Sequence, residues 1–148
     1  MPSNNEIKAR QAAQWDNVAE SWSRRDAELE ANSRPINEWL CEMAGLAPGH
    51  RVLDLASGSG QPALAIANLV GHDGWVAATD IAPRMVEVIA DKAREAGLSN
   101  VEARVMDSHW TFLMRASMQL PAVGVSCMRL IPPGRWPRSG VCSKTEAD

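Results

Sequence analysis

The stretch that most constrains the fold is residues 52–60, VLDLASGSG, in which a short apolar run ends at Asp54 and continues into a glycine-rich turn. Pro62 follows the turn, at a position that suits the first turn of a helix. Turns of this kind present backbone N–H groups and the positive end of a helix to a ligand. The carboxylate of Asp54 would repel a phosphate group here. The turn therefore favours a ligand whose nearby portion is positively charged.

The segments around this turn alternate between strand-like and helix-like patterns. We predict strands at residues 51–55, 75–79 and 101–106, the last of them half-exposed at an edge of the sheet. The stretches 63–70 and 83–96 have the apolar spacing of buried helices. This order of strands and helices predicts an α/β fold with a parallel sheet and right-handed crossovers.

The first 45 residues are predicted to form a helical cap. A polar helix is expected over residues 6–30, with Trp15, Val18 and Trp22 on one face that packs on the domain. A second helix is expected from Pro35 to Ala44, where Gly45 ends it. Its predicted apolar side consists of Ile36, Trp39, Leu40 and Met43.

An aspartate ends or follows each of the three predicted strands, at positions 54, 80 and 107. Parallel sheets bind ligands at the carboxyl ends of their strands. Asp80 can accept hydrogen bonds from both hydroxyls of a ribose, and Asp107 is placed to accept one from an exocyclic adenine amine. Ile81 and Met85 could contact the adenine faces. With a cation expected near Asp54, this set favours S-adenosylmethionine over a dinucleotide such as NAD or FAD.

Through these motifs, the segment of residues 14–107 resembles a class I S-adenosylmethionine-dependent methyltransferase, of the type similar to the quinone-biosynthesis C-methyltransferases. In the family's first motif an acidic residue precedes a G-x-G-x-G turn, and Ala56 stands here in place of the first glycine. The resemblance implies a Rossmann-like parallel sheet, incomplete because only its first three βα units are recognisable. It also implies methyl transfer from S-adenosyl-L-methionine to a small-molecule acceptor by in-line attack on the sulfonium methyl. No catalytic base is predicted.

The resemblance also implies roles for individual residues. The backbone from Ala56 to Gly60 would lie along the methionine portion, and the helix with Trp15 and Trp22 would cover the cofactor. The implied cofactor-binding residues are Asp54, Ala56, Ser57, Gly58, Ser59, Gly60, Asp80, Ile81, Met85, Asp107 and Ser108. Within this set Asp80 matches the ribose-binding acid, Met85 the residue on the adenine and Asp107 the acceptor from its amine.

Composition narrows the class of protein further. A length of 148 residues, 45% hydrophobic content and a net charge of −3 are typical of one globular domain, with no indication of nucleic acid as a partner. Cys41, Cys127 and Cys142 form no CxxC pair, so we expect no metal site and a reduced, cytoplasmic setting. No signal peptide or membrane span is expected.

Residues 108–148 do not continue the strand–helix pattern. They contain four prolines and carry 5 Lys/Arg against 2 Asp/Glu, whereas residues 1–107 carry 10 against 16. Back-translation shifted by one base allows a string similar to the family's fourth-strand region. We therefore hypothesise a frameshift near Ser108, which makes 108–148 an irregular, out-of-frame tail after the cofactor-binding half at 46–107. The strand at 51–55 would then lack its normal neighbour, which predicts an exposed apolar edge and a marginally stable, aggregation-prone chain with little or no turnover.

Two other functions remain open at this point. The chain could be a non-catalytic module that binds a nucleoside cofactor and docks a partner through a disordered basic tail. It could also be an NAD-dependent oxidoreductase, a function that Asp54 disfavours because of its charge.

Overall fold

The computed structural model describes residues 1–107 and 127–130. Its elements follow in the order α1 (Asn4–Arg24), α2 (Asp26–Met43), β1 (Arg51–Leu55), α3 (Ala63–Val70), β2 (Trp75–Asp80), α4 (Pro83–Glu95), β3 (Val101–Val105) and β4 (Cys127–Leu130). The three predicted strands and the two helices between them are confirmed, with ends that differ by no more than one residue. The predicted residue 108 and the rest of the tail outside 127–130 lie beyond the described residues.

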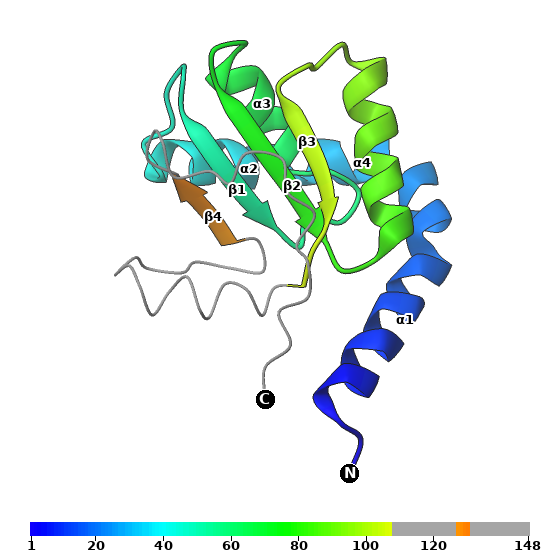
Figure 1. Ribbon diagram of the computed structural model, residues 1–148. Helices are drawn as coiled ribbons and strands as arrows, with labels where there is room; N and C mark the ends of the chain where they lie inside the picture. Colours follow the sequence, from blue (N-terminus) through cyan, green and yellow to red (C-terminus); the bar gives the residue numbers. More distant parts are fainter. Residues whose placement is uncertain (108–126, 131–148) are drawn as a thin grey trace, which may run out of the picture.

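The sheet has the order β3-β2-β1-β4, with β3 at the edge as predicted (Figure 1). The strands β1, β2 and β3 run parallel, with Arg51 opposite Trp75 and Val76 opposite Val101. The expectation that the edge of β1 is exposed is wrong, because β4 pairs with it in the antiparallel direction, from Val52 to Leu55. The tail is therefore not irregular at residues 127–130, and β4 covers the predicted bare edge of β1.

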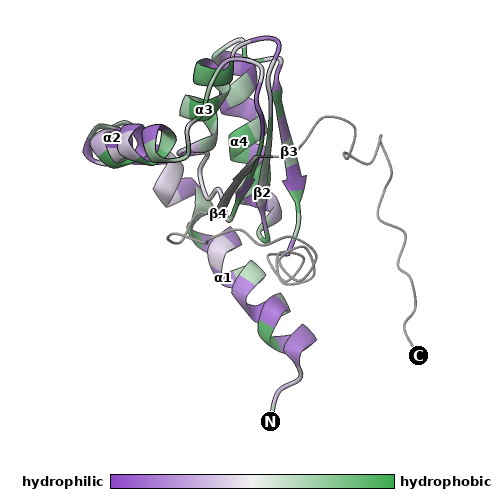
Figure 2. Cartoon of the chain, turned by 90° about the vertical axis from the view of Figure 1, so that its left-hand side faces the viewer, coloured by the Kyte–Doolittle hydropathy of each residue, from purple (hydrophilic) through white to green (hydrophobic). Residues whose placement is uncertain are grey.

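The helices α2, α3 and α4 lie on one face of the sheet (Figure 2). Because side chains alternate across a strand, Val52 and Val76 point to this face and join Ile66, Val70 and Ile89 in the main core cluster. These side chains are fully buried. The opposite face carries a second buried cluster formed by Leu53, Leu55 and Ala77, against which Met106 packs.

The helix α2 differs from the prediction in its start and in its buried side. The first helix ends at Arg24, so residues 26–30, predicted as its last part, belong to α2 instead. Because α2 begins at Asp26, Pro35 lies inside it instead of opening it. The residues that α2 buries are Asn37 and Cys41, and Cys41 belongs to the main core cluster. The predicted apolar side is wrong, because three of its members are more than half exposed: Ile36, Trp39 and Met43. The residue of α2 that joins the core is therefore the small Cys41, and the bulkier Ile36, Trp39 and Met43 lie on the exposed side of the helix.

The helix α1 packs on α4 through small side chains. Ala19 is buried with Ala82 and Met85, and Val18 packs against this cluster. Trp15 and Trp22 remain 45% and 42% exposed, with ring centroids 6.4 Å apart in an edge-on arrangement. The predicted face of α1 is therefore correct in position, but its contact is made by Val18 and Ala19 and only partly by the tryptophans.

Candidate functional site at the carboxyl end of the sheet

The turn after β1 has backbone φ angles that residues with a side chain rarely adopt. Ala56, Gly58 and Gly60 have positive φ angles of 56°, 54° and 112°. Glycine adopts such angles without strain, whereas alanine does not. A Cβ atom added at Gly58 would have no atom within 4 Å, so this side of the turn faces open space. The turn is therefore shaped to bring its backbone close to a ligand.

The end of β2 holds the first half of this turn. The amide of Ser57 donates to the Thr79 carbonyl at 2.8 Å, and the Thr79 amide donates back to the Ser57 hydroxyl at 3.1 Å. The Gly58 amide donates to Oδ2 of Asp80 at 3.0 Å, and the Ala82 amide donates to Oδ1 at 2.9 Å. Asp80 therefore links the turns after β1 and β2. Because a carboxylate can accept about four hydrogen bonds, Asp80 keeps capacity for the two hydroxyls of a ribose.

The carboxyl group of Asp54 is fully buried and has no hydrogen-bond partner among the described residues. Burial raises the pKa of Asp54 to about 7, and the negative charge of Asp80 acts in the same direction. The Ser57 hydroxyl lowers the pKa, although its own hydrogen bond goes to the Asp54 backbone carbonyl at 3.2 Å. A buried carboxyl group of this kind is stabilised when a positive charge or a hydrogen-bond donor approaches.

The other predicted residues lie in different surroundings. Asp107 forms an ion pair with Lys8 of α1 at 2.5 Å. Met85 is buried between α1 and α4, and Ile81 is half-buried at the turn after β2. Ser108 lies outside the described residues. The structure therefore joins the backbone carbonyl of Asp54, the turn and Asp80 in one hydrogen-bonded group, and it places Asp107 at the neighbouring strand end.

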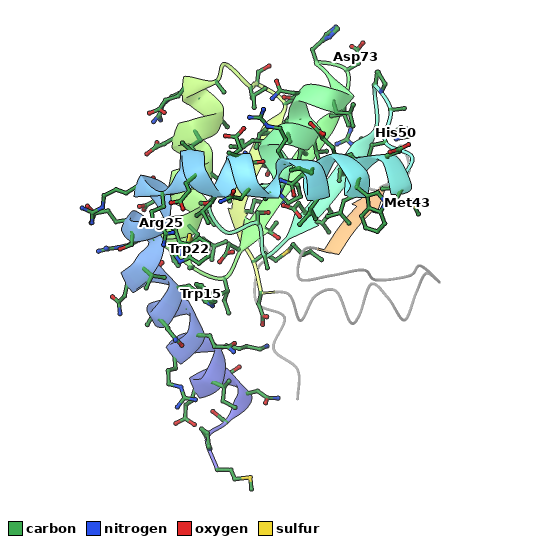
Figure 3. All side chains as sticks on the ribbon, turned by 180° about the vertical axis from the view of Figure 1, so that it is seen from behind. Trp15, Trp22, Arg25, Met43, His50 and Asp73 are labelled. Atoms are coloured by element: carbon green, nitrogen blue, oxygen red, sulfur yellow. The ribbon has the colours of Figure 1, made fainter. Side chains whose placement is uncertain are left out.

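Three residues that no sequence pattern indicated, Asp16, Asp26 and Lys92, join the N-terminal helices to this end of the sheet. Asp16 of α1 accepts a hydrogen bond at 2.9 Å from the Arg84 amide, in the first turn of α4. Asp26 of α2 forms an ion pair with Lys92 of α4 at 2.5 Å. No local pattern announces contacts between residues 66 or more positions apart. In Figure 3, Trp15 and Trp22 lie on the part of α1 that passes beside this region.

A separate groove of about 490 Å³ opens between α2 and α3. Its lining includes Asn37, Cys41 and Leu69, with Glu38 and Glu42 beside them. It borders the glycine-rich turn through Gln61 and contains none of the strand-end aspartates, so the ligand chemistry described above lies elsewhere. Within residues 1–107 and 127–130, no group of three His, Cys, Asp or Glu side chains could hold a metal ion, and no helix could cross a membrane.

These features fit the chemistry of S-adenosylmethionine better than that of a dinucleotide. The Asp54 carboxyl group is buried without a partner behind the turn and would interact favourably with the ammonium or sulfonium portion. Asp80 has unused acceptor capacity for ribose hydroxyls. A pyrophosphate would instead meet two carboxyl groups, those of Asp54 and Asp80, at the same place.

Comparison with known proteins agrees with this chemistry. A family profile described as "Methyltransferase domain" matches residues 52–136, which is more than half of the chain. The chain is 38% identical over 74 residues to an aklanonic acid methyltransferase of Streptomyces sp. (strain C5), covering 50% of this chain and 34% of that protein. It is 40% identical over 74 residues to a ubiquinone/menaquinone biosynthesis C-methyltransferase of Teredinibacter turnerae, covering 49% and 30%.

Solved structures show the same fold. An S-adenosylmethionine-dependent methyltransferase from Aquifex aeolicus superposes with a TM-score of 0.50 at 29% identity, covering 58% of this chain and 47% of that one. A second structure, from Methanococcus maripaludis, has a TM-score of 0.54 at 24% identity and supports the fold alone, covering 64% and 42%. The chain thus spans about a third to a half of the length of these proteins. It belongs to the methyltransferase-domain family of the class I S-adenosylmethionine-dependent methyltransferases.

Proposed function

We propose that this chain binds S-adenosyl-L-methionine at the carboxyl ends of β1, β2 and β3, and that the protein transfers the methyl group to a small-molecule acceptor. The observation that carries the proposal is the buried Asp54 carboxyl group beside a turn whose Gly58 amide is held by Asp80. In this proposal Asp80 accepts hydrogen bonds from the ribose, and the backbone of residues 56–60 follows the methionine portion.

The remaining predicted residues complete the proposed cofactor site. Asp107 accepts from the adenine amine once the ligand competes with Lys8 for its carboxylate. In this proposal Ile81 lies beside the adenine. Met85 instead packs beneath the adenine site, because it is buried against Ala19 and Ala82. The helix α1, with its half-exposed tryptophans, covers the adenosine portion.

When bound, the cofactor supplies a methyl group that its sulfonium already activates. An in-line transfer of this group to an acceptor would release S-adenosylhomocysteine. The residues of this chain then contribute by holding the reacting atoms in line and by excluding water, effects that supply much of the rate when the leaving group is already activated.

A small molecule is the proposed acceptor for two reasons. The relatives with about 40% identity are named for aklanonic acid and for ubiquinone and menaquinone biosynthesis. In addition, residues 1–107 carry 10 Lys/Arg against 16 Asp/Glu, a balance that disfavours contact with an RNA backbone. A relative that methylates ribosomal RNA matches over only 14% of its own length.

The test is a transfer assay with S-adenosylmethionine labelled in the methyl group. The protein is incubated with quinol-type and polyketide-type aromatic acceptors, and in parallel with ribosomal RNA. We expect label in a small aromatic acceptor, and the Asp80→Ala variant should abolish it. Label in RNA alone would contradict the proposed acceptor class, whereas cofactor binding without transfer to any acceptor would favour a non-catalytic binding module.

A further inference from the structure

The second half of the glycine-rich turn is held by contacts different from those of the first half. Ser57 and Gly58 bind to the end of β2, but Ser59 reaches toward the helices. Nζ of Lys92 on α4 donates to the Ser59 carbonyl at 2.7 Å. The Ser59 hydroxyl donates to Oδ1 of Asp26 on α2 at 3.2 Å. Lys92 and Asp26 thus contact Ser59 from two separate elements.

Lys92 and Asp26 also bind each other, which closes the group. Nζ of Lys92 lies 2.5 Å from Oδ1 of Asp26. Their side chains are 17% and 20% exposed, whereas those of the pair Arg94–Asp91 on the same helix are 74% and 59% exposed. Water and salt therefore weaken the Lys92–Asp26 pair much less than an ordinary surface ion pair.

This group fixes the orientation of one peptide unit. The Ser59 carbonyl and the Gly60 amide belong to the same planar peptide. Lys92 holds the carbonyl, and the Gly60 amide donates to the Ser57 carbonyl at 2.9 Å. Gly60 has a φ angle of 112°, and glycine tolerates both signs of φ, so this peptide would rotate at little cost without its two partners. Lys92 is therefore one of the two partners that hold this peptide in its orientation, and it is the one supplied by a side chain.

We propose that Lys92 and Asp26 are positioning residues for the cofactor turn, and that they hold Ser59 and the following peptide in the conformation that receives the methionine portion of the cofactor. The proposal rests on the function proposed above. It gives α2 an indirect role in cofactor binding, because Asp26, which contacts Ser59, is the first residue of that helix. It also separates the second half of the turn from the first half, which Asp80 holds.

The test compares two ligands that share the adenosine portion. S-adenosylhomocysteine and adenosine are titrated calorimetrically into the wild-type chain and into Lys92→Met. We expect Lys92→Met to bind S-adenosylhomocysteine about tenfold more weakly, or about 1.4 kcal/mol, with the affinity for adenosine unchanged. Lys92→Arg should bind both ligands like the wild type, because a guanidinium can also contact a carbonyl and a carboxylate.

Matched variants isolate the positioning role. Arg94→Met removes the exposed pair on the same helix and should leave both affinities unchanged. Asp26→Asn should weaken S-adenosylhomocysteine binding less than Lys92→Met. The double variant Asp26→Asn/Lys92→Met should bind as weakly as Lys92→Met alone, because the two residues act as one unit. If Lys92→Met does not fold, Lys92→Gln keeps a donor for the carbonyl and should show a smaller loss for S-adenosylhomocysteine alone.

Two results would overturn the proposal while leaving the proposed function intact. One is unchanged affinity of Lys92→Met for S-adenosylhomocysteine. The other is an equal loss for both ligands, which would show that Lys92 supports the fold in general. Failure of the wild-type chain to bind S-adenosylhomocysteine would instead overturn the proposed function, and this inference with it.

Discussion

At the scale of single residues, two positions in the turn after β1 share a backbone angle but differ in residue type. Ala56 and Gly58 have nearly the same φ angle, 56° and 54°, but one is alanine and the other glycine. An L side chain at such an angle costs roughly 1–2 kcal/mol, part of which is offset because glycine loses more freedom on folding. The resemblance implies that Ala56 replaces a family glycine, and the structure shows that it does so at a positive φ angle.

We therefore predict opposite effects of two substitutions on stability. Ala56→Gly should raise the free energy of unfolding by about 0.5–1 kcal/mol, and Gly58→Ala should lower it by a similar or larger amount. Chemical denaturation of both variants beside the wild type measures these changes. A loss of stability in Ala56→Gly would show that the turn does not hold this angle in solution.

A second prediction concerns pH and Asp54. Its pKa is raised from 3.8 to about 7 in the folded chain. Between about pH 4 and pH 7 the unfolded chain has lost a proton that the folded chain retains, so stability falls as the pH rises and then levels off above about pH 7. Unfolding is measured across this range for the wild type and for Asp54→Asn, which does not titrate. The stability of the wild type relative to this variant should decrease by on the order of 4 kcal/mol. Parallel profiles would contradict the assigned pKa.

At the scale of elements, Asn100 completes the end of α3. Its side-chain amide, which is almost fully buried, donates to the carbonyls of Ala67 and Gly71 at 2.8 Å each. These carbonyls belong to the last turn of the helix and its C-cap, where intrahelical donors are missing. Because Asn100 directly precedes β3, this contact ties the helix to the edge strand.

We predict that Asn100→Ala lowers the free energy of unfolding by about 1–2 kcal/mol. Both carbonyls keep one backbone donor, from Gly71 and Gly74, so the loss should not be larger. Asn68→Ala is the control, since its amide donates to Leu64 within the same helix from an exposed position. Equal effects of the two substitutions in thermal unfolding would show that the contact with the end of α3 contributes nothing.

Helices and strands could be predicted from the sequence where their signals lie in neighbouring residues. The strand at 51–55 and the helix from Pro83 carry their signals in consecutive residues, and both are confirmed. The start of α2 could not be found in this way, because Pro35 is a start signal that the structure places inside the helix. Its buried side depends on how closely Cys41 approaches the core, which is a tertiary property. For the same reason, the sequence around Asp26 or around Lys92 could not predict the ion pair between them.

At the scale of the whole molecule, β4 is the feature that the sequence did not indicate. It pairs antiparallel with β1, whereas the remaining strands are parallel. The family match also continues to residue 136, within the segment predicted as a tail. The pairing with β4 covers the apolar edge of β1. The prediction of aggregation was based on that edge being exposed, so this basis no longer holds.

The frameshift near Ser108 stays a proposal and has a direct test. The coding DNA is sequenced across codons 105–148 and beyond the stop codon. We expect a one-base shift to open a continuous frame that encodes further strand and helix patterns. If no such frame exists, the tail is a genuine part of the protein, and the binding-module function gains support.

We propose that the carboxyl ends of β1, β2 and β3 bind S-adenosylmethionine and not a dinucleotide. The most direct measurement is the shift of the thermal unfolding midpoint of the wild-type chain with S-adenosylhomocysteine, with NADH, and with both together. We predict a rise that grows with the concentration of S-adenosylhomocysteine, no rise with NADH, and loss of the effect in Asp80→Ala. Stabilisation by NADH, or no stabilisation by S-adenosylhomocysteine, would contradict the account.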